Sequence, residues 1–349
     1  MTDKVKVGVV GYGVIGKRVA DAVHAQPDME LVGIADIISD ARMDIAVKRG
    51  YPIYCWDSNF KDSFTKSGIE IAGLDTDFVE ELDIVVDCTP KGIPDKNRSK
   101  FNNIPTIVQG GEPHKSQDAS FSTFANYDDV IGKKRVRVVS CNTTGLARVL
   151  SSLDRAYGID KSFISIVRRA ADPLRSNRGP INGVVPVLGK SHHGPDVVTV
   201  MPQLEGKIYS LAIAASFTLS HVHMLQIKLN NIPSNGKKDV INLWRSTPRI
   251  ITRQGREGLF DTAQLVEYYR DLGRLRYDRP ENFIWEETID VTPDGNCYFI
   301  MDIHMESIPI PENVDCIRAM LEMEDDYLKS AYKTDLALEI LNENANYGI

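Results

Sequence analysis

The sequence lacks the features that would place the chain at a membrane. No apolar run approaches the roughly 18 residues of a membrane-spanning helix. The residues after Met1 lead directly into a strand-like stretch, which leaves no room for a signal peptide. We therefore expect a cytoplasmic protein without a membrane partner.

Cysteines are few, and positive charge is not in excess. The five cysteines are odd in number and widely spread, and no two form a Cys-x-x-Cys pair. This pattern favours reduced thiols over a disulfide framework, and it predicts no metal site. The net charge is −7, and no basic stretch is interleaved with aromatic residues, so we expect no nucleic-acid partner.

The length and composition are those of an ordinary globular protein. The chain has 349 residues, of which 42% are hydrophobic and 26% charged, so about two domains are expected. Short β-branched runs in the first part alternate with helical patterns and end in glycine, proline or small polar residues; they cover residues 5–10, 30–35, 83–86, 106–109 and 136–139. This alternation predicts a doubly wound parallel α/β sheet of the Rossmann type over residues 1–140.

The pattern changes after Gly145. Longer strand-like stretches follow, at residues 163–168, 207–217, 221–229 and 298–304. Residues 172–202 are rich in proline and glycine and suggest one long structured loop. We expect an α+β catalytic domain with a mixed or antiparallel sheet over residues 141–306. Pro311 then opens what the apolar spacing predicts to be a long terminal helix.

A glycine motif follows the first strand. Gly11, Gly13 and Gly16 form G-x-G-x-x-G before a helix, and Asp36 comes 20 residues after Gly16 at the end of the next strand. This context is typical of a dinucleotide site, in which the glycines permit the tight turn, the approach of the pyrophosphate and the helix–strand packing. The alternative is a glycine turn in another βα unit. Asp36 favours NAD over NADP, although the nearby Arg42 complicates this preference.

Cys141 is the candidate nucleophile. It stands in Cys141-Asn142-Thr143-Thr144-Gly145, after a strand and before a helix expected to begin near Leu146. A helix N-terminus lowers the pKa of a nearby thiol, and Asn142 with the adjacent N–H groups can donate to an oxyanion. The alternative is a buried structural cysteine, which is how we interpret the other four cysteines.

Histidines supply the candidate base. His221 and His223 lie on a predicted strand and point to one face, and the pattern by itself does not choose between them. The alternatives are a zinc-ligand pair or two structural histidines, and no third ligand is suggested by the spacing. Basic and hydroxyl groups at residues 168–169, 143–144 and 191–196 would suit an oxyanion or phosphate.

Together these motifs resemble the archaeal-type phosphorylating glyceraldehyde-3-phosphate dehydrogenases along essentially the whole chain. The resemblance rests on Gly-Tyr-Gly-Val-Ile-Gly-Lys-Arg-Val-Ala (11–20), Asp-Cys-Thr-Pro (87–90), Gln-Gly-Gly-Glu (109–112), Val-Ser-Cys-Asn-Thr-Thr-Gly-Leu (139–146), Val-Arg-Arg-Ala-Ala-Asp-Pro (167–173), Gly-Pro-Ile-Asn (179–182) and His-His-Gly-Pro-Asp (192–196).

The resemblance implies oxidation of glyceraldehyde 3-phosphate to 1,3-bisphosphoglycerate with NAD(P) and inorganic phosphate, through a thioester on Cys141, in glycolysis and gluconeogenesis. It selects His221 as the base. It implies substrate contacts from Cys141, Asn142, Thr143, His193 and Gly194, and dinucleotide contacts from Val14, Ile15, Gly110 and Arg169. It also implies a homotetramer, and a terminal segment, residues 307–349, that packs back on the dinucleotide domain.

Two positions depart from the family pattern. Members commonly have Lys-Thr after the second strand, suited to the extra phosphate of NADP, where this chain has Asp36-Ile37. Members often have Gln after a late histidine, where here Met305 follows His304. The first difference favours NAD, and the second removes an amide that would contact the nicotinamide.

Two other functions are compatible with the motifs. One is another thioester-forming reductase of the same architecture, acting on a semialdehyde or an acyl phosphate. The other, of a different class, is a nucleotide sensor without catalysis. The first requires a pocket for a carboxylate or an amino acid, and the second does not require Cys141.

Overall fold

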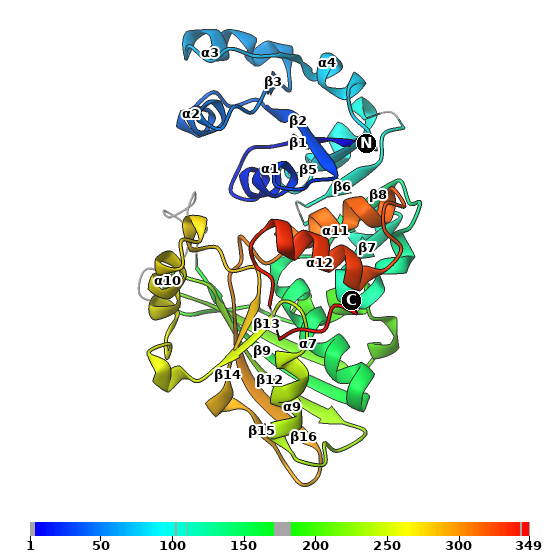
Figure 1. Ribbon diagram of the computed structural model, residues 1–349, viewed down its shortest axis with the longest axis vertical. Coiled ribbons are helices and arrows are strands. Elements are labelled where there is room, and N and C mark those ends of the chain that lie inside the picture. Colours follow the sequence, from blue (N-terminus) through cyan, green and yellow to red (C-terminus); the bar gives the residue numbers. More distant parts are fainter. Residues whose placement is uncertain (1–3, 102, 110, 171–182, 343, 349) are drawn as a thin grey trace. The chain divides into compact units, whose positions relative to one another are not determined.

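The computed structural model describes residues 4–101, 103–109, 111–170, 183–342 and 344–348. The chain divides into two compact units (Figure 1). The first comprises Met1–Ser140 and Ile310–Glu339, and the second comprises Cys141–Pro309 and Ile340–Ile349. The chain therefore leaves the first unit at the candidate nucleophile and returns to it after Pro309.

An eight-stranded sheet forms the first unit, and all its strand pairs are parallel. Its strands, in spatial order, are β4 (Gly73–Leu74), β3 (Ile53–Cys55), β2 (Met29–Asp36), β1 (Val5–Val10), β5 (Ile84–Asp87), β6 (Thr106–Val108), β8 (Arg135–Val138) and β7 (Ala119–Phe121). The helices of this unit are α1 (Gly16–His24), α2 (Ala41–Lys48), α3 (Lys61–Lys66), α4 (Asp75–Glu80), α5 (Pro94–Asn97), α6 (Thr123–Asn126), α11 (Ile310–Met320) and α12 (Tyr327–Ala337).

The strands of this sheet are apolar because both of its faces are covered. Val7 and Val9 of β1 belong to one apolar cluster, and Val10 of the same strand belongs to another on the opposite face. Ile317 of α11 joins the first cluster, so a helix from the end of the sequence packs on a sheet built from its beginning. The predicted doubly wound sheet is confirmed.

A mixed sheet forms the second unit, as expected. Its strands, in spatial order, are β10 (Val185–Pro186), β11 (Ile208–Ala215), β9 (Ile159–Arg169), β12 (His221–Leu229), β16 (Asn296–Ile303), β14 (Asn282–Trp285) and β13 (Ile250–Arg253), with β15 (Asp290–Val291) paired to β16. The pairs β9–β11 and β13–β14 are parallel, and the other pairs are antiparallel. The helices of this unit are α7 (Cys141–Tyr157), α8 (His193–Val198), α9 (Lys237–Arg245) and α10 (Thr262–Asp271).

Three local expectations were wrong. The helix after the strand at residues 136–139 begins at Cys141 rather than near Leu146, because the polar residues 142–144 form its buried first turn. The described part of the expected loop contains α8, in which Pro195 occupies the first turn and needs no intrahelical partner for its nitrogen. The terminal helix is two helices: Glu322 has a positive φ of 55°, and Asp326 caps the start of α12.

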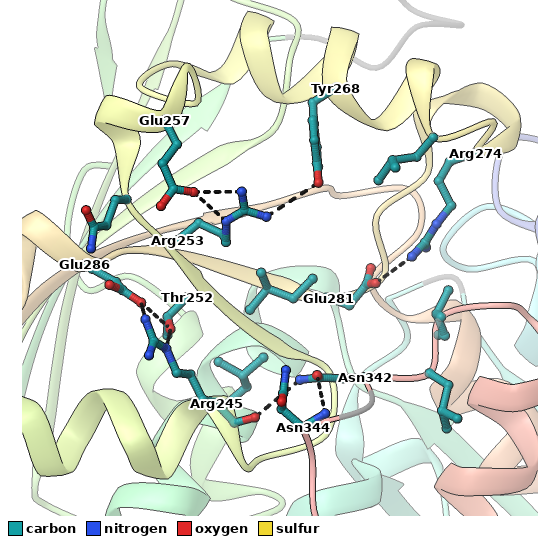
Figure 2. A pocket seen from close by; sticks show the side chains of 16 residues that line it. Arg245, Thr252, Arg253, Glu257, Tyr268, Arg274, Glu281, Glu286, Asn342 and Asn344 are labelled. Atoms are coloured by element: carbon teal, nitrogen blue, oxygen red, sulfur yellow. Dashed lines mark hydrogen bonds and ion pairs between the residues drawn. The ribbon is translucent and has the colours of Figure 1, made fainter.

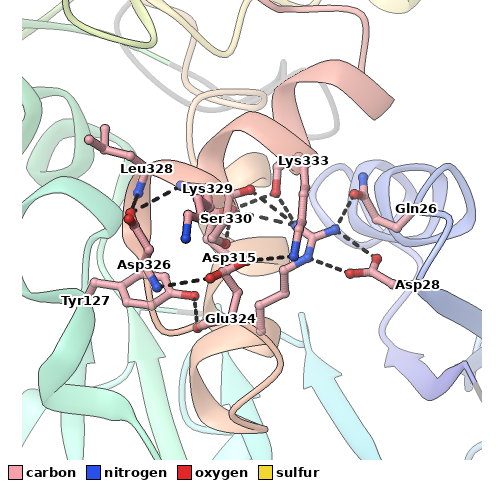
Figure 3. A network of polar contacts seen from close by, with 12 residues as sticks. Gln26, Asp28, Tyr127, Asp315, Glu324, Asp326, Leu328, Lys329, Ser330 and Lys333 are labelled. Atoms are coloured by element: carbon pink, nitrogen blue, oxygen red, sulfur yellow. Dashed lines mark hydrogen bonds and ion pairs between the residues drawn. The ribbon is translucent and has the colours of Figure 1, made fainter. Parts of the chain in front are cut away.

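A buried arginine fastens the terminal helices to the first unit. Arg318 of α11 has no exposed surface (0%) and donates to both carboxylate oxygens of Asp28, at 2.8 and 2.9 Å. It also donates to Gln26 Oε1 at 2.7 Å and to Thr334 Oγ1 of α12 at 2.6 Å. Figure 3 shows Gln26 and Asp28, which follow α1, facing the network that also includes Asp315 and Ser330. The last residues leave this unit: Asn346 N–H donates to the carbonyl of Ser246 in the second unit.

Replacing Arg318 should destabilise the chain strongly. Arg318→Met leaves the fully buried Asp315 and the carboxylate of Asp28 without their cation, and breaking a buried ion pair costs about 3–5 kcal/mol. Urea unfolding followed by circular dichroism measures the loss. Arg42→Met is the matched control, because its pair with Asp40 is largely exposed and should contribute less than about 1 kcal/mol. Equal losses in the two variants would contradict the role given to Arg318.

Candidate active site

The glycine motif forms a tight loop between β1 and α1. Gly11 has a φ of +87°, and its N–H donates to the carbonyl of Ala35 at 2.8 Å, which closes the turn after β1. A Cβ at Gly16 would lie 1.8 Å from the carbonyl oxygen of Gly11, so no larger residue fits there. A Cβ at Gly13 would meet no atom within 4 Å. The loop is therefore closed on its inner side and open at Gly13, where a pyrophosphate can approach the backbone.

The open part of the loop lies directly before α1. Residues 13–15, which include Val14 and Ile15, are partly exposed, and α1 begins at Gly16. The first N–H groups of a helix have no partner within the helix and favour an anionic ligand. Gly110, also expected at the dinucleotide, lies outside the described residues.

Asp36 organises this loop from the end of β2. One carboxylate oxygen accepts from Tyr12 N–H at 2.7 Å, and the other accepts from the N–H groups of Ile37 and Ile38 at 2.7 and 3.1 Å. Burial raises the pKa of Asp36, while these N–H groups act in the opposite direction. Arg42 is held by a bidentate contact with Asp40. The carboxylate of Asp36 thus holds the loop in place and still has lone pairs for a hydroxyl donor.

Cys141 is the first residue of α7 and is partly exposed. Burial raises the pKa of its thiol to about 12, although the N–H of Asn142 and the charges of Arg168 and Arg169 lower it. The N–H at the helix start therefore lowers the pKa of the thiol, as expected. Desolvation raises this pKa by more, so the thiol is protonated at neutral pH. Attack on a carbonyl carbon then requires a group that takes the proton.

The two histidines of β12 lie on a strand that packs against α7, the helix that begins at Cys141. Both are buried, on the face of β12 that carries every second residue. Burial lowers the pKa of His223 to about 3 and that of His221 well below its ordinary value, so both rings are neutral. His223 Nε2 lies 2.8 Å from Asn142 Oδ1, and His221 Nδ1 accepts from Arg169 N–H at 3.1 Å.

The structure brings the expected substrate residues together around α7 and α8. Thr143 Oγ1 donates to Asp196 Oδ2 at 2.6 Å, which ties the first turn of α7 to α8. Gly194 N–H donates to Ser210 Oγ of β11 at 3.0 Å. His193 is 2% exposed, and among the described residues neither of its ring nitrogens has a hydrogen-bond partner. Burial, with the neighbouring His192 and Arg168, lowers the pKa of His193 to about 3.

Arg169, expected at the dinucleotide, is held inside the second unit. Its guanidinium lies 2.7 Å from Glu306 Oε1, with both side chains buried, and its Nε lies 3.3 Å from Met305 Sδ. Sequence reasoning missed Glu306 and Asp196 as parts of this cluster. The sequence did carry a signal for each residue. Glu306 comes three residues after the end of β16, and Asp196 ends the His-His-Gly-Pro-Asp motif.

A separate polar cavity of about 910 Å³ lies between β13, α10 and the chain's last residues (Figure 2). Three arginines line it, and each is paired with a glutamate: Arg245 with Glu286, Arg253 with Glu257, and Arg274 with Glu281. The lining residues that the structure describes include no cysteine and no histidine, and each of their arginines is paired with a glutamate. We therefore take the cluster around Cys141 as the candidate active site.

None of the helices in the part of the chain that the structure describes is long and apolar enough to span a membrane. In the same part of the chain, no group of three or more His, Cys, Asp or Glu side chains could hold a metal ion.

Substitution by alanine should have different effects at Gly16 and at Gly13. Gly16→Ala forces the loop or α1 to move, and overpacking of this kind costs about 1–3 kcal/mol or more. Gly13→Ala should keep the stability of the parent chain and weaken dinucleotide binding, because its Cβ occupies only the open space. Thermal unfolding and titration of NAD measure the two effects. Unchanged NAD affinity in a stable Gly13→Ala protein would contradict the placement of the pyrophosphate.

A family profile and several curated proteins are similar to this chain. A family profile described as "Glyceraldehyde 3-phosphate dehydrogenase, C-terminal domain" matches residues 140–272. Proteins named glyceraldehyde-3-phosphate dehydrogenase from Methanococcus vannielii and Methanobacterium formicicum are both 46% identical to this chain, over 342 and 341 residues. One from Methanocaldococcus jannaschii is 44% identical over 342 residues. Each alignment covers 96% of this chain and 99% of the relative. The chain belongs to the glyceraldehyde-3-phosphate dehydrogenase family, whose members use a nicotinamide dinucleotide.

Proposed function

We propose that this chain oxidises glyceraldehyde 3-phosphate to 1,3-bisphosphoglycerate with NAD(P) and inorganic phosphate, and catalyses the reverse reaction. The observation that carries the proposal is the position of Cys141. It is the first residue of α7, in a helical turn bonded to His223 of β12 and to Asp196 of α8. A thiol, neutral imidazoles and polar N–H groups in one cluster are what a thioester mechanism requires.

The first chemical step is addition of sulfur to the aldehyde. His221 takes the thiol proton, and Cys141 Sγ forms a bond to the carbonyl carbon, whose oxygen becomes negatively charged. Asn142 donates to this oxygen. Thr143, His193 and Gly194 complete the substrate contacts. We keep His221 as the base because the family pattern selects it, while both His221 and His223 are neutral in the structure.

The later steps convert the adduct to an acyl phosphate. A bound nicotinamide dinucleotide would supply the hydride acceptor for oxidation of the former aldehyde carbon, which would then be held on Cys141 Sγ at the oxidation level of a thioester. An oxygen of inorganic phosphate attacks this thioester, and the thiolate leaves and regains a proton. The balance is aldehyde, NAD⁺ and phosphate to acyl phosphate, NADH and one proton. Gly11, Gly13, residues 14–16 and Asp36 would hold the dinucleotide.

Cofactor preference, location and pathway follow from the same proposal. The carboxylate of Asp36 would repel a 2′-phosphate, so we expect NAD to be preferred to NADP. Because Cys141 must remain a free thiol, and all five cysteines are free, we place the enzyme in the reducing cytoplasm. A reaction that runs in both directions would serve both glycolysis and gluconeogenesis.

The decisive assay is phosphate-dependent reduction of NAD and of NADP with glyceraldehyde 3-phosphate. We expect turnover with both phosphate and aldehyde present, and a higher kcat/KM with NAD. Cys141→Ser should lose at least about 1000-fold in kcat, and His221→Ala about 100- to 10,000-fold.

Each alternative has its own outcome in this assay. Activity that is indifferent to phosphate, or absent with both dinucleotides, would refute the proposed reaction. A preference for aspartate semialdehyde over glyceraldehyde 3-phosphate would indicate a related reductase. Equal turnover by wild type and Cys141→Ser would support a nucleotide sensor.

We also propose a homotetramer, with the outer face of the mixed sheet as one interface between copies. Tyr209 pairs with Phe163 across β11 and β9, and their rings stack at 5.3 Å. Leu211 of β11 and Met224 of β12 both pair with Ser165 of β9. Because Ser165 is two residues after Phe163, these side chains lie on the same face as the stacked rings. The four apolar side chains are 41–69% exposed. A contiguous exposed apolar patch on a regular sheet favours a protein partner, and a second copy of the chain is the partner we propose.

A charge on this face should disrupt the assembly. Leu211→Glu should reduce the mass measured by sedimentation velocity, because the carboxylate would be buried at the interface without a partner. Leu272→Glu, on a similarly exposed leucine after α10, is the control and should leave the mass unchanged. A wild-type chain that sediments as a monomer would refute the tetramer, and an unchanged Leu211→Glu mass would refute the interface.

A further inference from the structure

His223 is a buried histidine to which the proposed reaction gives no role. Its side chain has no exposed surface (0%), and its Nε2 lies 2.8 Å from Asn142 Oδ1. Asn142 follows Cys141 in the first turn of α7. This hydrogen bond therefore connects the central strand β12 to the residue next to the nucleophile.

The proton of His223 can be assigned by counting partners. Burial and the neighbouring His193 lower the pKa of His223 to about 3, so the ring is neutral at neutral pH and carries a single N–H. Its Nδ1 is enclosed and has no partner among the described residues. An orphaned buried N–H is rarer in proteins than an orphaned acceptor. The proton therefore lies on Nε2, which donates it to Asn142 Oδ1.

This donation fixes the direction of the Asn142 amide. A carboxamide has an acceptor oxygen at one end and an amino group with two N–H donors at the other. Because Oδ1 is held by His223, Nδ2 is turned away from β12. No hydrogen bond from Nδ2 to another described residue is formed. Within the part of the chain that the structure describes, these donors are therefore open to a ligand.

We propose that His223 is a positioning residue, which holds the Asn142 amide so that Nδ2 rather than Oδ1 faces the substrate oxygen during attack by Cys141. The inference rests on the proposed function. An N–H at this place stabilises the negative charge that develops on the oxygen, whereas Oδ1 would repel it. Because the charge develops only in the transition state, the contribution falls on kcat more than on KM.

Two amide variants separate this role from simple filling of the core. The Nε2 of glutamine in His223→Gln lies near the position of the histidine Nε2 and can donate to Asn142 Oδ1. His223→Asn is one carbon shorter, keeps a polar amide and cannot reach that oxygen. We expect His223→Gln to keep kcat within about 5-fold of wild type, and His223→Asn to lose about 100-fold, with KM within about 3-fold in both.

A double-mutant cycle with Asn142→Ala tests whether His223 acts through Asn142. Asn142→Ala alone should lose about 100-fold in kcat, since one oxyanion donor is removed. If His223 acts through this amide, Asn142→Ala combined with His223→Asn should lose no more than Asn142→Ala alone. Independent roles would instead multiply to a loss of about 10,000-fold. Should His223→Asn fail to fold, His223→Met gives the same cycle with an apolar side chain of similar length and no donor.

The outcomes distinguish this inference from the proposed function. Multiplied losses, or a His223→Gln enzyme as slow as His223→Asn, would overturn the role of His223 while an active wild type upholds the reaction. Alkylation of Cys141 by iodoacetamide uses no oxyanion donor and should change by less than about 3-fold in every variant. A fall in alkylation that parallels kcat would show that His223 supports the whole site, and would also overturn the inference. An inactive wild type would overturn the proposed function, and this inference with it.

Discussion

The start of α7 at Cys141 is the constraint on which the candidate site depends. The first N–H groups of a helix have no partners inside it, and the polar side chains of this first turn are bonded to other elements. Here Asn142 is bonded to His223 of β12, and Thr143 is bonded to Asp196 of α8. Each of these contacts ties a residue that follows Cys141 closely in sequence to another element. The same first turn thus presents the nucleophile and assembles the residues around it.

Burial sets the charge state of this cluster. It raises the pKa of Cys141 and lowers the pKa of His193, His221 and His223, so all four groups are neutral before substrate binds. Charge remains in the buried pair of Arg169 and Glu306, whose charged groups lie 2.7 Å apart. A neutral site surrounded by fixed donors is suited to stabilising a charge that develops only during reaction.

Local patterns in the sequence predicted most of the first unit and missed several elements of the second. Buried parallel strands are short β-branched runs, and the glycine motif fixes where α1 begins, so these elements carry their own signals. The start of α7 was placed too late because polar residues 142–144 are typical of a loop, and only tertiary contacts make them a helical turn. The terminal helix was predicted as continuous because Leu321 and Leu328 fit one apolar stripe, whereas the turn at Glu322 and the cap at Asp326 divide it.

The sequence by itself determined the class of chemistry and the two architectures, since a glycine motif after a strand, a cysteine before a helix and two histidines on one strand face depend only on local spacing. It did not determine which groups those residues contact. Tertiary structure decided these contacts. His223 bonds to Asn142, and His221 accepts from the backbone N–H of Arg169. Asp36 accepts from three N–H groups. The physical reason is that hydrogen-bond partners far apart in sequence are chosen by packing, and burial then sets their protonation.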